Sequence, residues 1–325
     1  MRLTPSLAQQ DIVDSTDEYL KKEFPISRVR EAGRVERECA VDEPTWRRWA
    51  EQGFFSLGLP EDAGGLGLGP VEEFLVAEQF GRHLTPGPIA SSIVAAHVAH
   101  EAGQHKLARA ILDGERRVGL RVADTGYDVE SGGLVLTVTS GGAEIHRVAE
   151  LTRLASIDPA TRLSRVVVGD RVADVATEHA QLRLWILQSA MLAGAAQAAQ
   201  EQSTSYAKVR HQFGQPIGAF QAVKHRCADM AVRCYVAGAQ LQLAALAIDE
   251  GWPDARFQCA AALSLALEAA RANVAVNVQN HGGIGFTDEH DAGLFLKRAT
   301  ALAAAVGDDS SRVAALTAPE PSMFT

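Results

Sequence analysis

The sequence predicts a mostly α-helical protein with an N-terminal helical domain (residues 1–115), a reduced middle β module (116–178) and a C-terminal four-helix bundle (179–325). Three observations predict this fold class. Apolar residues recur at helical spacing over most of the chain, β-branched runs are confined to the middle module, and four long Ala/Leu-rich segments follow it. A chain of 325 residues is also longer than one ordinary core requires, which favours two or three packing units.

The N-terminal domain is predicted to consist of helices separated by loops. Apolar and charged residues alternate at helical spacing over 6–24, and Pro44 stands where a first helical turn tolerates proline. Glycines and a proline make 58–69 a loop. Helical spacing then predicts three further helices, over 71–81, 89–102 and 106–112.

The middle module is predicted to be a small β structure. Short β-branched runs at 118–122, 134–139 and 166–168 are separated by Gly-Gly and Asp-Pro turns. The module holds only about 60 residues, which we expect to be too few for a sizeable core of its own.

The rest of the chain is predicted to be helical again. Four long segments with short loops between them imply a helical bundle, and they cover 182–210, 222–250, 254–279 and 291–306.

Charge and composition exclude several function classes. Lys+Arg 31 against Asp+Glu 40 gives 31 − 40 = −9, so a nucleic-acid-binding surface is not expected. The four cysteines form no CxxC pair and have no histidine at zinc-like spacing, so neither a metal site nor a disulfide framework is predicted. No apolar run is read as reaching the roughly 18 residues of a membrane span, and the start lacks a signal peptide. We therefore expect a cytoplasmic protein.

Two segments place polar groups where long helices end, at 206–221 and 279–286. A diphosphate needs a fixed cation and backbone that can approach closely, which Arg210 and the Gly282-Gly283 pair could supply. Gln279 could hold an adenine edge or a phosphate oxygen. The alternative interpretation is that each segment is only a helix C-cap followed by a loop, with Arg210 solvated.

Taken together, these segments resemble the acyl-CoA dehydrogenase family. Its signature has the form R-x-x-F-G-x-P-I-x-x-F-Q, present here at 210–221, followed much later by Q-x-x-G-G-x-G-F, present at 279–286. Three N-terminal segments are also similar to that family's first helical domain, at 49–53, 59–67 and 77–82. The resemblance covers residues 1 to about 115 and 180 to 315.

The resemblance implies that FAD removes a hydride from the β-carbon of a fatty or steroidal acyl-CoA while a base removes the α-proton. It also implies that residues of the two signature segments hold the adenosine diphosphate part of FAD across a dimer interface. Carried over to this sequence, this adenosine clamp consists of Arg210, Gln212, Phe213, Phe220, Gln221, Gln279, Gly282 and Gly283.

The sequence departs from the family in its middle domain and at the base. The segment that binds the flavin ring in the family is replaced by 124–128, so we expect an incomplete ring pocket. The family's catalytic Glu stands at one of two places, which correspond to Gly307 or Asp308 and to the vicinity of Leu184. Neither place holds a Glu, and we assign no catalytic residue on this chain.

Other titratable residues are interpreted as structural. Asp308 and Glu178 are typical of solvated surface positions. His211, His225 and His281 lie near the clamp, where histidines more often pack or form hydrogen bonds than act as bases.

A chain with a clamp but no base fits half of a composite active site. It resembles short acyl-CoA dehydrogenase subunits of steroid-degrading actinobacteria, which pair with a full-length homologue as α2β2 heterotetramers with one flavin per pair. The implied substrate is a steroid side-chain CoA thioester and the implied electron acceptor is an electron-transfer flavoprotein. Two alternatives stay open: a self-sufficient homomeric dehydrogenase with Asp308 or a relocated carboxylate as base, and a non-catalytic scaffold with a dehydrogenase fold.

Overall fold

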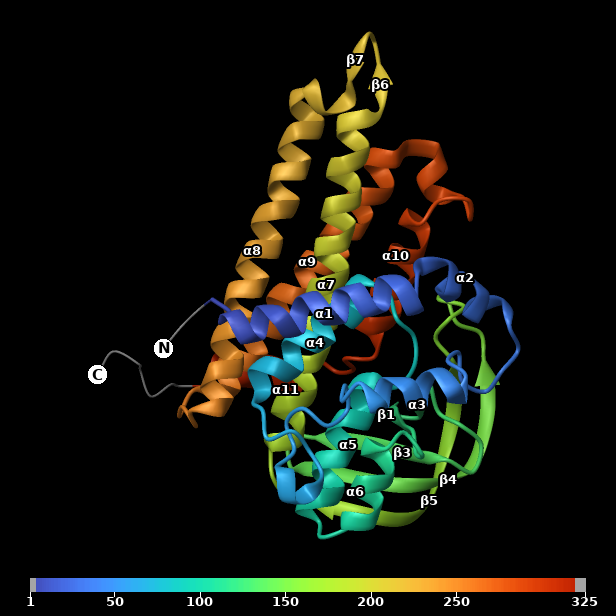
Figure 1. Cartoon of the computed structure of the whole chain (residues 1–325), viewed down its shortest axis with the longest axis vertical. Helices are drawn as coiled ribbons and strands as arrows, with labels where there is room; N and C mark the ends of the chain where they lie inside the picture. Colours follow the sequence, from blue (N-terminus) through green and yellow to red (C-terminus); the bar gives the residue numbers. More distant parts are fainter. Residues whose placement is uncertain (1–3, 319–325) are drawn as a thin grey trace.

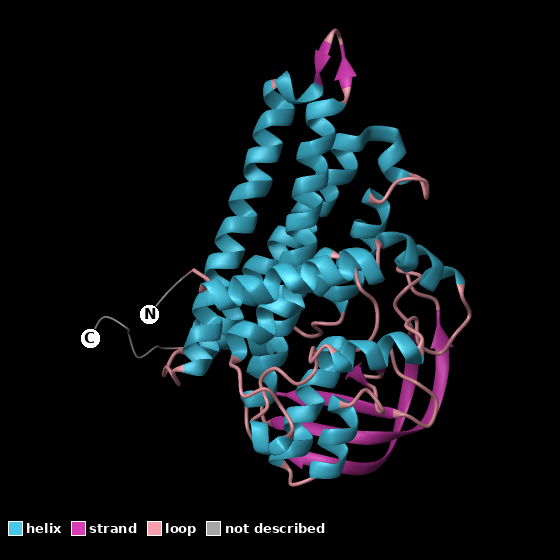
Figure 2. Ribbon diagram, in the orientation of Figure 1, coloured by secondary structure: helices cyan, strands magenta, loops and turns pink. Residues whose placement is uncertain are grey.

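The computed structural model describes residues 4–318 and confirms the predicted fold class. The long helices of the C-terminal bundle rise from one side of the molecule, and the β module lies at the other end with N-terminal helices packed against it (Figures 1 and 2). One large hydrophobic core runs through all three parts. The modules therefore fold as one packed body.

Six helices form the N-terminal part: α1 (Leu7–Glu23), α2 (Ile26–Arg34), α3 (Glu43–Glu51), α4 (Pro70–Arg82), α5 (Ile89–Glu101) and α6 (His105–Leu112), with a 3₁₀ turn η1 (Glu61–Ala63) in the predicted loop. Helix α1 begins with a capping box in which Ser6 and Gln9 satisfy each other's backbone N–H groups. Asp42 caps α3 by accepting a hydrogen bond from the backbone N–H of Thr45 at 2.8 Å. The short helix α2 was not expected from the sequence.

Aromatic side chains around α3 form the centre of this N-terminal part. Trp46 stacks on Phe55 with ring centroids 4.4 Å apart, and Trp49 meets Phe80 edge to face at 5.3 Å. All four are almost fully buried. Such pairs stabilise a core beyond the area that they bury, so the aromatic residues after Pro44 anchor α3 to α4.

The middle module is a closed five-stranded barrel. Its strands pair in the order β1-β2-β5-β4-β3, with β1 and β3 parallel and all other pairs antiparallel. The strands are β1 (Val118–Val122), β2 (Thr125–Tyr127), β3 (Leu134–Thr139), β4 (Gly142–Leu154) and β5 (Leu163–Val175). The sequence reading is confirmed for β1 and β3, whose bounds it gave, and for part of β5, but it missed β2, β4 and most of β5.

The physical reason is that β4 and β5 are largely exposed strands of 13 residues each, whose solvent-facing positions carry charged side chains. Only a few residues of the barrel form a separate interior cluster, namely Val129, Val135, Val148 and Val166. The other buried barrel residues join the core shared with the helices.

The C-terminal part contains the four long helices and some short elements. The helices are α7 (His179–Val209), α8 (Gln221–Asp249), α9 (Ala255–His281), α10 (Ala292–Ala304) and the short α11 (Ser310–Thr317). A hairpin of β6 (His211–Gln212) and β7 (Gln215–Pro216), with η2 (Ile217–Ala219), joins α7 to α8, and η3 (Gly282–Phe286) follows α9.

Three buried asparagines set the register between α9 and its neighbours. Asn273 donates to the backbone carbonyls of Ala196 at 3.2 Å and Met230 at 3.1 Å. Further along the same face, Asn277 donates to Gln202 at 2.6 Å, and Asn280 donates to Ser203 at 2.7 Å. A shift of α9 along its axis would leave these buried amides unpaired, so they favour one alignment of the helices.

Two helical stretches of the described residues, 221–249 and 255–286, are long and apolar enough to cross a membrane by length and composition alone. This corrects the sequence reading, which found no run of that length. Core helices of soluble bundles pass the same test. In the stretch 255–286, 56% of the most apolar 18-residue window is buried. In α8 only 33% of the corresponding window is buried, because α8 lies at the outside of the bundle (Figure 1).

A buried polar cluster joins the barrel to α10. The side chain of Arg298 lies with its Nε 3.0 Å from Asp158 Oδ2 and donates from Nη1 to Thr161 Oγ1 at 3.1 Å. Asp128 is buried beside this pair and accepts a hydrogen bond from the backbone N–H of Arg162 at 2.9 Å. Desolvation raises the pKa of Asp128 to about 6, although the Arg162 N–H and the charge of Arg298 oppose the rise.

This raised pKa predicts that Asp128→Asn stabilises the protein in a pH-dependent way. The folded pKa lies above the ordinary value of 3.8, so the native state binds the proton more tightly and ionisation of Asp128 destabilises it as the pH rises through this window. We expect Asp128→Asn to raise the free energy of unfolding at pH 7.5 by about 1–3 kcal/mol, and to change it much less at pH 4. Asparagine also tolerates the positive φ of 52° at this position.

Urea unfolding of both proteins at the two pH values measures this difference. An equal effect at both pH values, or a loss of stability confined to pH 7.5, would contradict the assignment of Asp128 as a buried, reluctantly ionised acid.

Candidate functional site

Helix α7 carries the two places that the sequence singled out, one near each end. Leu184 lies in its second turn, and Arg210 is the residue that ends it. They are 26 residues apart (210 − 184), which corresponds to about 39 Å along the helix axis. The adenosine clamp and the expected position of the base are therefore separate sites on this chain.

The first clamp segment is the hairpin at the tip of the bundle (Figure 1). Phe213 occupies its turn with a φ of 52°, is 92% exposed, and meets Phe220 edge to face at 6.1 Å. The side chain of Gln212 donates to the backbone carbonyl of His211 at 2.8 Å. Gln221 is the exposed first residue of α8. The hairpin thus projects aromatic and polar side chains away from the rest of the chain.

The second clamp segment lies beside the end of α7. Gln279 is exposed in the last turn of α9, and Gly282 ends that helix with a φ of 65°. The ring of His281 packs on that of Tyr206 in the last turn of α7, with centroids 4.2 Å apart. This contact, together with the Asn280–Ser203 hydrogen bond, brings the two signature segments to the same end of the bundle.

His281 is a packing residue, as the sequence reading expected. Its Nδ1 lies 2.8 Å from the backbone carbonyl of Asn277, and burial lowers its pKa. The ring of His290 lies 4.2 Å from that of His281. His281 is thus held within a stack of rings rather than presented to the surface.

The clamp residues fit a diphosphate that approaches from outside the chain. Among the described residues Arg210 has no side-chain hydrogen bond or ion pair, and its side chain is exposed. A Cβ added at Gly282 or Gly283 would meet nothing within 4 Å, so the backbone there is open. Both segments also end a helix, as the alternative interpretation expected. A segment that ends a helix can also bind a diphosphate, so the two interpretations are compatible.

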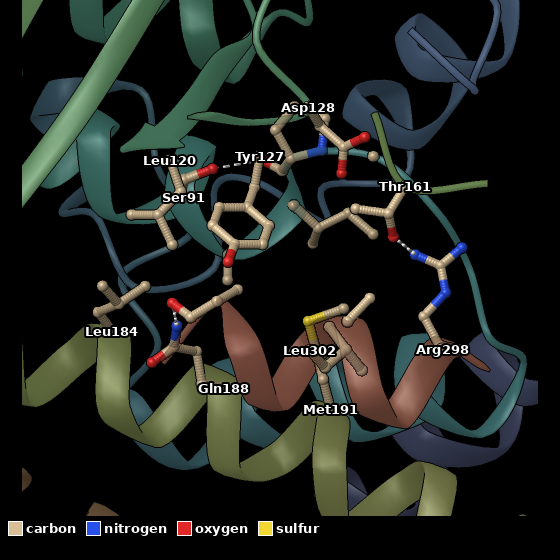
Figure 3. A pocket seen from close by; sticks show the side chains of 16 residues that line it. Ser91, Leu120, Tyr127, Asp128, Thr161, Leu184, Gln188, Met191, Arg298 and Leu302 are labelled. Carbon is tan, nitrogen blue, oxygen red and sulfur yellow. Dashed lines mark hydrogen bonds between the residues drawn. The ribbon is translucent and has the colours of Figure 1, made fainter. Parts of the chain in front are cut away.

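Two adjoining cavities lie near the other end of α7. The outer cavity, of about 360 Å³, is enclosed by β1, β3, α7 and the segment 306–311. The inner cavity, of about 60 Å³, lies between the barrel, α5, α7 and α10 (Figure 3). Leu120, Leu184 and Gln188 line both of them, so the two cavities adjoin at these side chains.

Both expected positions of the family's base line the outer cavity, and neither holds a Glu. Leu184 and Gly307, which are far apart in the sequence, line the same cavity, and Val306 precedes Gly307. Asp308 is the one carboxylate in the lining of this cavity. It is fully exposed, and hydrogen bonds from Ser310 lower its pKa. Glu178 lines neither cavity and pairs with Arg256 at 2.9 Å.

Sequence reasoning did not identify several residues of the cavities. Asp128 and Tyr127 face the inner cavity from the barrel, while Arg298 faces it from α10 (Figure 3). The only sequence signal for Tyr127 and Asp128 was that 124–128 takes the place of the family's ring-binding segment. The buried polar residues Gln181 and Gln188 gave no signal at all, because they lie within an apolar helical pattern.

Comparison with protein families gives two matches. Residues 6–115 match the acyl-CoA dehydrogenase N-terminal domain, and residues 186–316 match the acyl-CoA dehydrogenase C-terminal domain.

Similar proteins and structures agree with these matches. Acyl-CoA dehydrogenase IpdE2 of Mycobacterium tuberculosis (strain ATCC 25618 / H37Rv) is 32% identical, over 91% of this chain and 92% of that protein. Acyl-CoA dehydrogenase FadE34 of the same strain is 34% identical over 84% of this chain, which spans only 42% of FadE34.

Among solved structures, a variant of the Tcur3481–Tcur3483 steroid ACAD has a TM-score of 0.83 at 22% identity, covering 95% of this chain and 96% of that one. The ChsE4–ChsE5 complex from Mycobacterium tuberculosis has a TM-score of 0.82 at 23% identity, covering 99% and 100%. At these identities the structures show a shared fold. The family matches and the IpdE2 relationship go further, and this chain belongs to the acyl-CoA dehydrogenase family.

Proposed function

We propose that this chain is the clamp-bearing subunit of a composite, FAD-dependent acyl-CoA dehydrogenase. In this proposal the enzyme desaturates the α,β-bond of an acyl-CoA, with a steroid side-chain CoA thioester as substrate. This chain holds the adenosine diphosphate part of FAD, and a full-length homologous partner holds the flavin ring and supplies the base. When bound, FAD supplies the acceptor for the substrate hydride.

This proposal rests on the distance along α7 between the clamp and the cavity. Clamp and cavity lie about 39 Å apart along the helix. The chain of about seven bonds that joins the diphosphate to the ring of FAD spans about 10 Å at most. A single FAD therefore cannot use both the clamp and the cavity of one chain, so the ring of an FAD held by this clamp lies in another subunit.

The lining of the cavity favours a partner that differs from this chain. In a homodimer the ring would lie at an identical cavity, where Leu184 occupies one position of the base and Gly307 or the fully exposed Asp308 occupies the other. A full-length homologue with the Glu would complete the site, and this favours an α2β2 assembly. The ChsE4–ChsE5 complex, which shares the fold, supports this arrangement by analogy.

The exposed tip of the bundle is suited to such an assembly. Phe213 on the hairpin and Phe286 on η3 are each at least 75% exposed. Clusters of exposed aromatic residues mark interaction surfaces.

Within the complete site, Arg210 would pair with the diphosphate, Gln279 would bond the adenosine diphosphate, and the Gly282-Gly283 backbone would allow close approach. An electron-transfer flavoprotein as acceptor and a cytoplasmic location complete the proposal.

A specific observation keeps the self-sufficient enzyme as the second candidate. Asp128 is a buried carboxyl group at the inner cavity with a pKa raised to about 6, which is a property of general bases. It is a relocated carboxylate of the kind that this alternative requires. A pure scaffold is disfavoured, because packing within the chain does not require an exposed Arg210 beside open glycine backbone.

The first expected result concerns flavin content. Purified alone, this chain should be flavin-poor, because its clamp holds only one half of FAD. Co-expression with a full-length homologue from the same source should give a yellow complex with one FAD per pair. Absorbance spectra and protein quantification measure the ratio. A fully flavinated and active preparation of the single chain would contradict the composite site.

The clamp itself is tested with two variants in the reconstituted complex. Arg210→Ala removes a charge-assisted contact to the diphosphate, and we expect a tenfold to hundredfold loss of FAD affinity. Gly283→Val should act similarly by keeping the backbone away from the phosphates, and a Cβ added there meets nothing within 4 Å in the chain. Equilibrium dialysis with FAD gives the affinities.

Arg47→Ala is the matched control, since Arg47 is an exposed arginine on α3 whose ion pair with Glu43 lies on the same helix. It should leave the FAD affinity unchanged. If both clamp variants bind FAD as well as the wild type, the two segments are only helix caps.

The location of the base is tested by turnover at equal flavin content. If the partner supplies the base, Asp308→Asn and Glu178→Gln should leave turnover of the complex within about threefold, while loss of the partner's Glu should reduce it by about 10²-fold to 10⁴-fold. A fall of about a hundredfold confined to Asp308→Asn would place the base on this chain and favour the self-sufficient enzyme.

A further inference from the structure

Arg30 on α2 joins the N-terminal part of the chain to the loop that follows the second clamp segment. This loop, residues 287–291, connects η3 to α10. The guanidinium of Arg30 donates from Nε and Nη2 to Asp291 Oδ1, at 3.1 and 2.5 Å, and from Nη1 to the backbone carbonyl of Asp288. The two partners lie 261 and 258 residues further along the chain, so the contact is a tertiary one that no local motif produces.

Asp291 stands at the N-cap of α10, where an aspartate usually accepts a hydrogen bond from a backbone N–H of the first turn. Within residues 4–318 its side chain forms no such capping bond, because the carboxylate accepts the two hydrogen bonds from Arg30. The ring of His290 accepts the backbone N–H of Ala292 at 3.1 Å instead. A local rule that is broken in this way is expected where a side chain is needed for another contact.

Helix α2 is a fixed support for Arg30. In Figure 1 it lies between α10 and the strands of the barrel. Arg162, the residue before β5, donates to three carbonyls around the C-terminal end of α2, namely those of Ala32, Val35 and Arg37, at 2.9, 2.6 and 2.9 Å. Carbonyls at this end of a helix lack partners within the helix, and a cation there is favourable. The barrel therefore holds one end of α2 while Arg30 projects toward the loop.

The loop is connected to the second clamp segment by a stack of rings. The ring of His290 lies 4.2 Å from that of His281, which lies 4.2 Å from that of Tyr206 at the end of α7. His281 directly precedes Gly282, where the chain takes the φ of 65° that ends α9. A displacement of the loop would break this stack or move His281, and the backbone at Gly282 would move with it.

We propose that Arg30 is a positioning residue for the adenosine clamp. By binding Asp291 and the backbone of Asp288 it fixes loop 287–291, and the ring stack passes this placement on to the backbone of Gly282 and Gly283. Arg30 acts through the loop and not on the diphosphate itself. The inference rests on the proposed function of the clamp, and it adds that the N-terminal part of the chain sets the affinity for FAD.

Hydrogen–deuterium exchange of the FAD-free chain tests the first step. The backbone N–H groups of Thr287 and His290 form hydrogen bonds within the loop, at 3.1 and 3.4 Å, so their exchange reports how well the loop is held. Arg30→Ala and Asp291→Asn should each speed exchange over 282–291 by about threefold to tenfold and leave the hairpin unchanged. Asparagine is chosen because it caps helices as well as aspartate does, so α10 still begins normally.

The FAD affinity of the reconstituted complex, measured by equilibrium dialysis, tests the second step. Arg30→Ala and Asp291→Asn should each weaken FAD binding by about threefold to tenfold, because a loosely held clamp must be ordered when FAD binds. The double variant should bind FAD no more weakly than Arg30→Ala, since both changes remove the same contact.

Arg256→Ala is the matched control. Arg256 is 30% exposed, against 21% for Arg30, and it forms an ion pair with Glu178 at 2.9 Å across the opposite end of α9. Arg256→Ala should lower the melting temperature about as much as Arg30→Ala does, but it should change neither the FAD affinity nor the exchange over 282–291. A residue with only a structural role would lower both properties in step with the melting temperature.

The two steps fail separately. Unchanged exchange over 282–291 in both variants overturns the proposal, whatever the complex binds. Faster exchange with unchanged FAD affinity also overturns it, as do effects of Arg30→Ala and Asp291→Asn on affinity that add in the double variant, or an equal loss of affinity in Arg256→Ala. If exchange is faster but the wild-type complex binds no FAD, the proposed function is wrong, while the hold of Arg30 on this segment is supported.

Discussion

The structure depends on α7 remaining one straight helix of 31 residues from the barrel to the tip of the bundle. It packs tightly on α4, where Gly81 and Gly194 allow the two backbones to touch. A Cβ at Gly194 would lie 2.0 Å from the carbonyl oxygen of Glu78, and one at Gly81 would lie 2.1 Å from that of Met191. Any side chain at either position would force the helices apart, and the cavity wall that α7 forms would move with them.

The two ends of α7 are held in different ways. Near its beginning, Arg183 pairs with the buried carboxylate of Glu73, which also lies 2.8 Å from Nε2 of His97 on α5. This buried network fixes the cavity end against the N-terminal helices. At its other end Tyr206 packs on His281 at the end of α9, and α7 leads directly into the exposed hairpin, so the two signature segments lie at an exposed end of the bundle.

The Arg298–Asp158 pair fixes the opposite wall of the inner cavity. Arg298 is 3% exposed, and a buried ion pair of this kind contributes more to a defined geometry than to net stability. Asp128 adds a second acid beside this pair, and the raised pKa of its carboxyl group follows first from burial and then from the nearby charge of Asp158. The junction of barrel and bundle is therefore both the wall of the cavities and a place where protonation affects folding.

The sequence by itself determined most of the helices and singled out the two signature segments. Helical periodicity marked most of the long helices, and the ordered residues from Arg210 to Gln221 and from Gln279 to Phe286 identified two segments that the structure brings to one end of the bundle. These features could be predicted from the sequence because each depends on residues that lie close together in the chain.

Only the tertiary structure decided the barrel and the cavities. Strands β4 and β5 carry charged residues on their exposed side and are stabilised by pairing with each other, so neither shows a continuous apolar pattern. The meeting of Leu184 with Gly307, the burial of Asp128 and the contact of Arg30 with Asp291 all join residues that are distant in the sequence. Local periodicity cannot encode such contacts, because packing between elements creates both the burial and the hydrogen bonds that give these residues their properties.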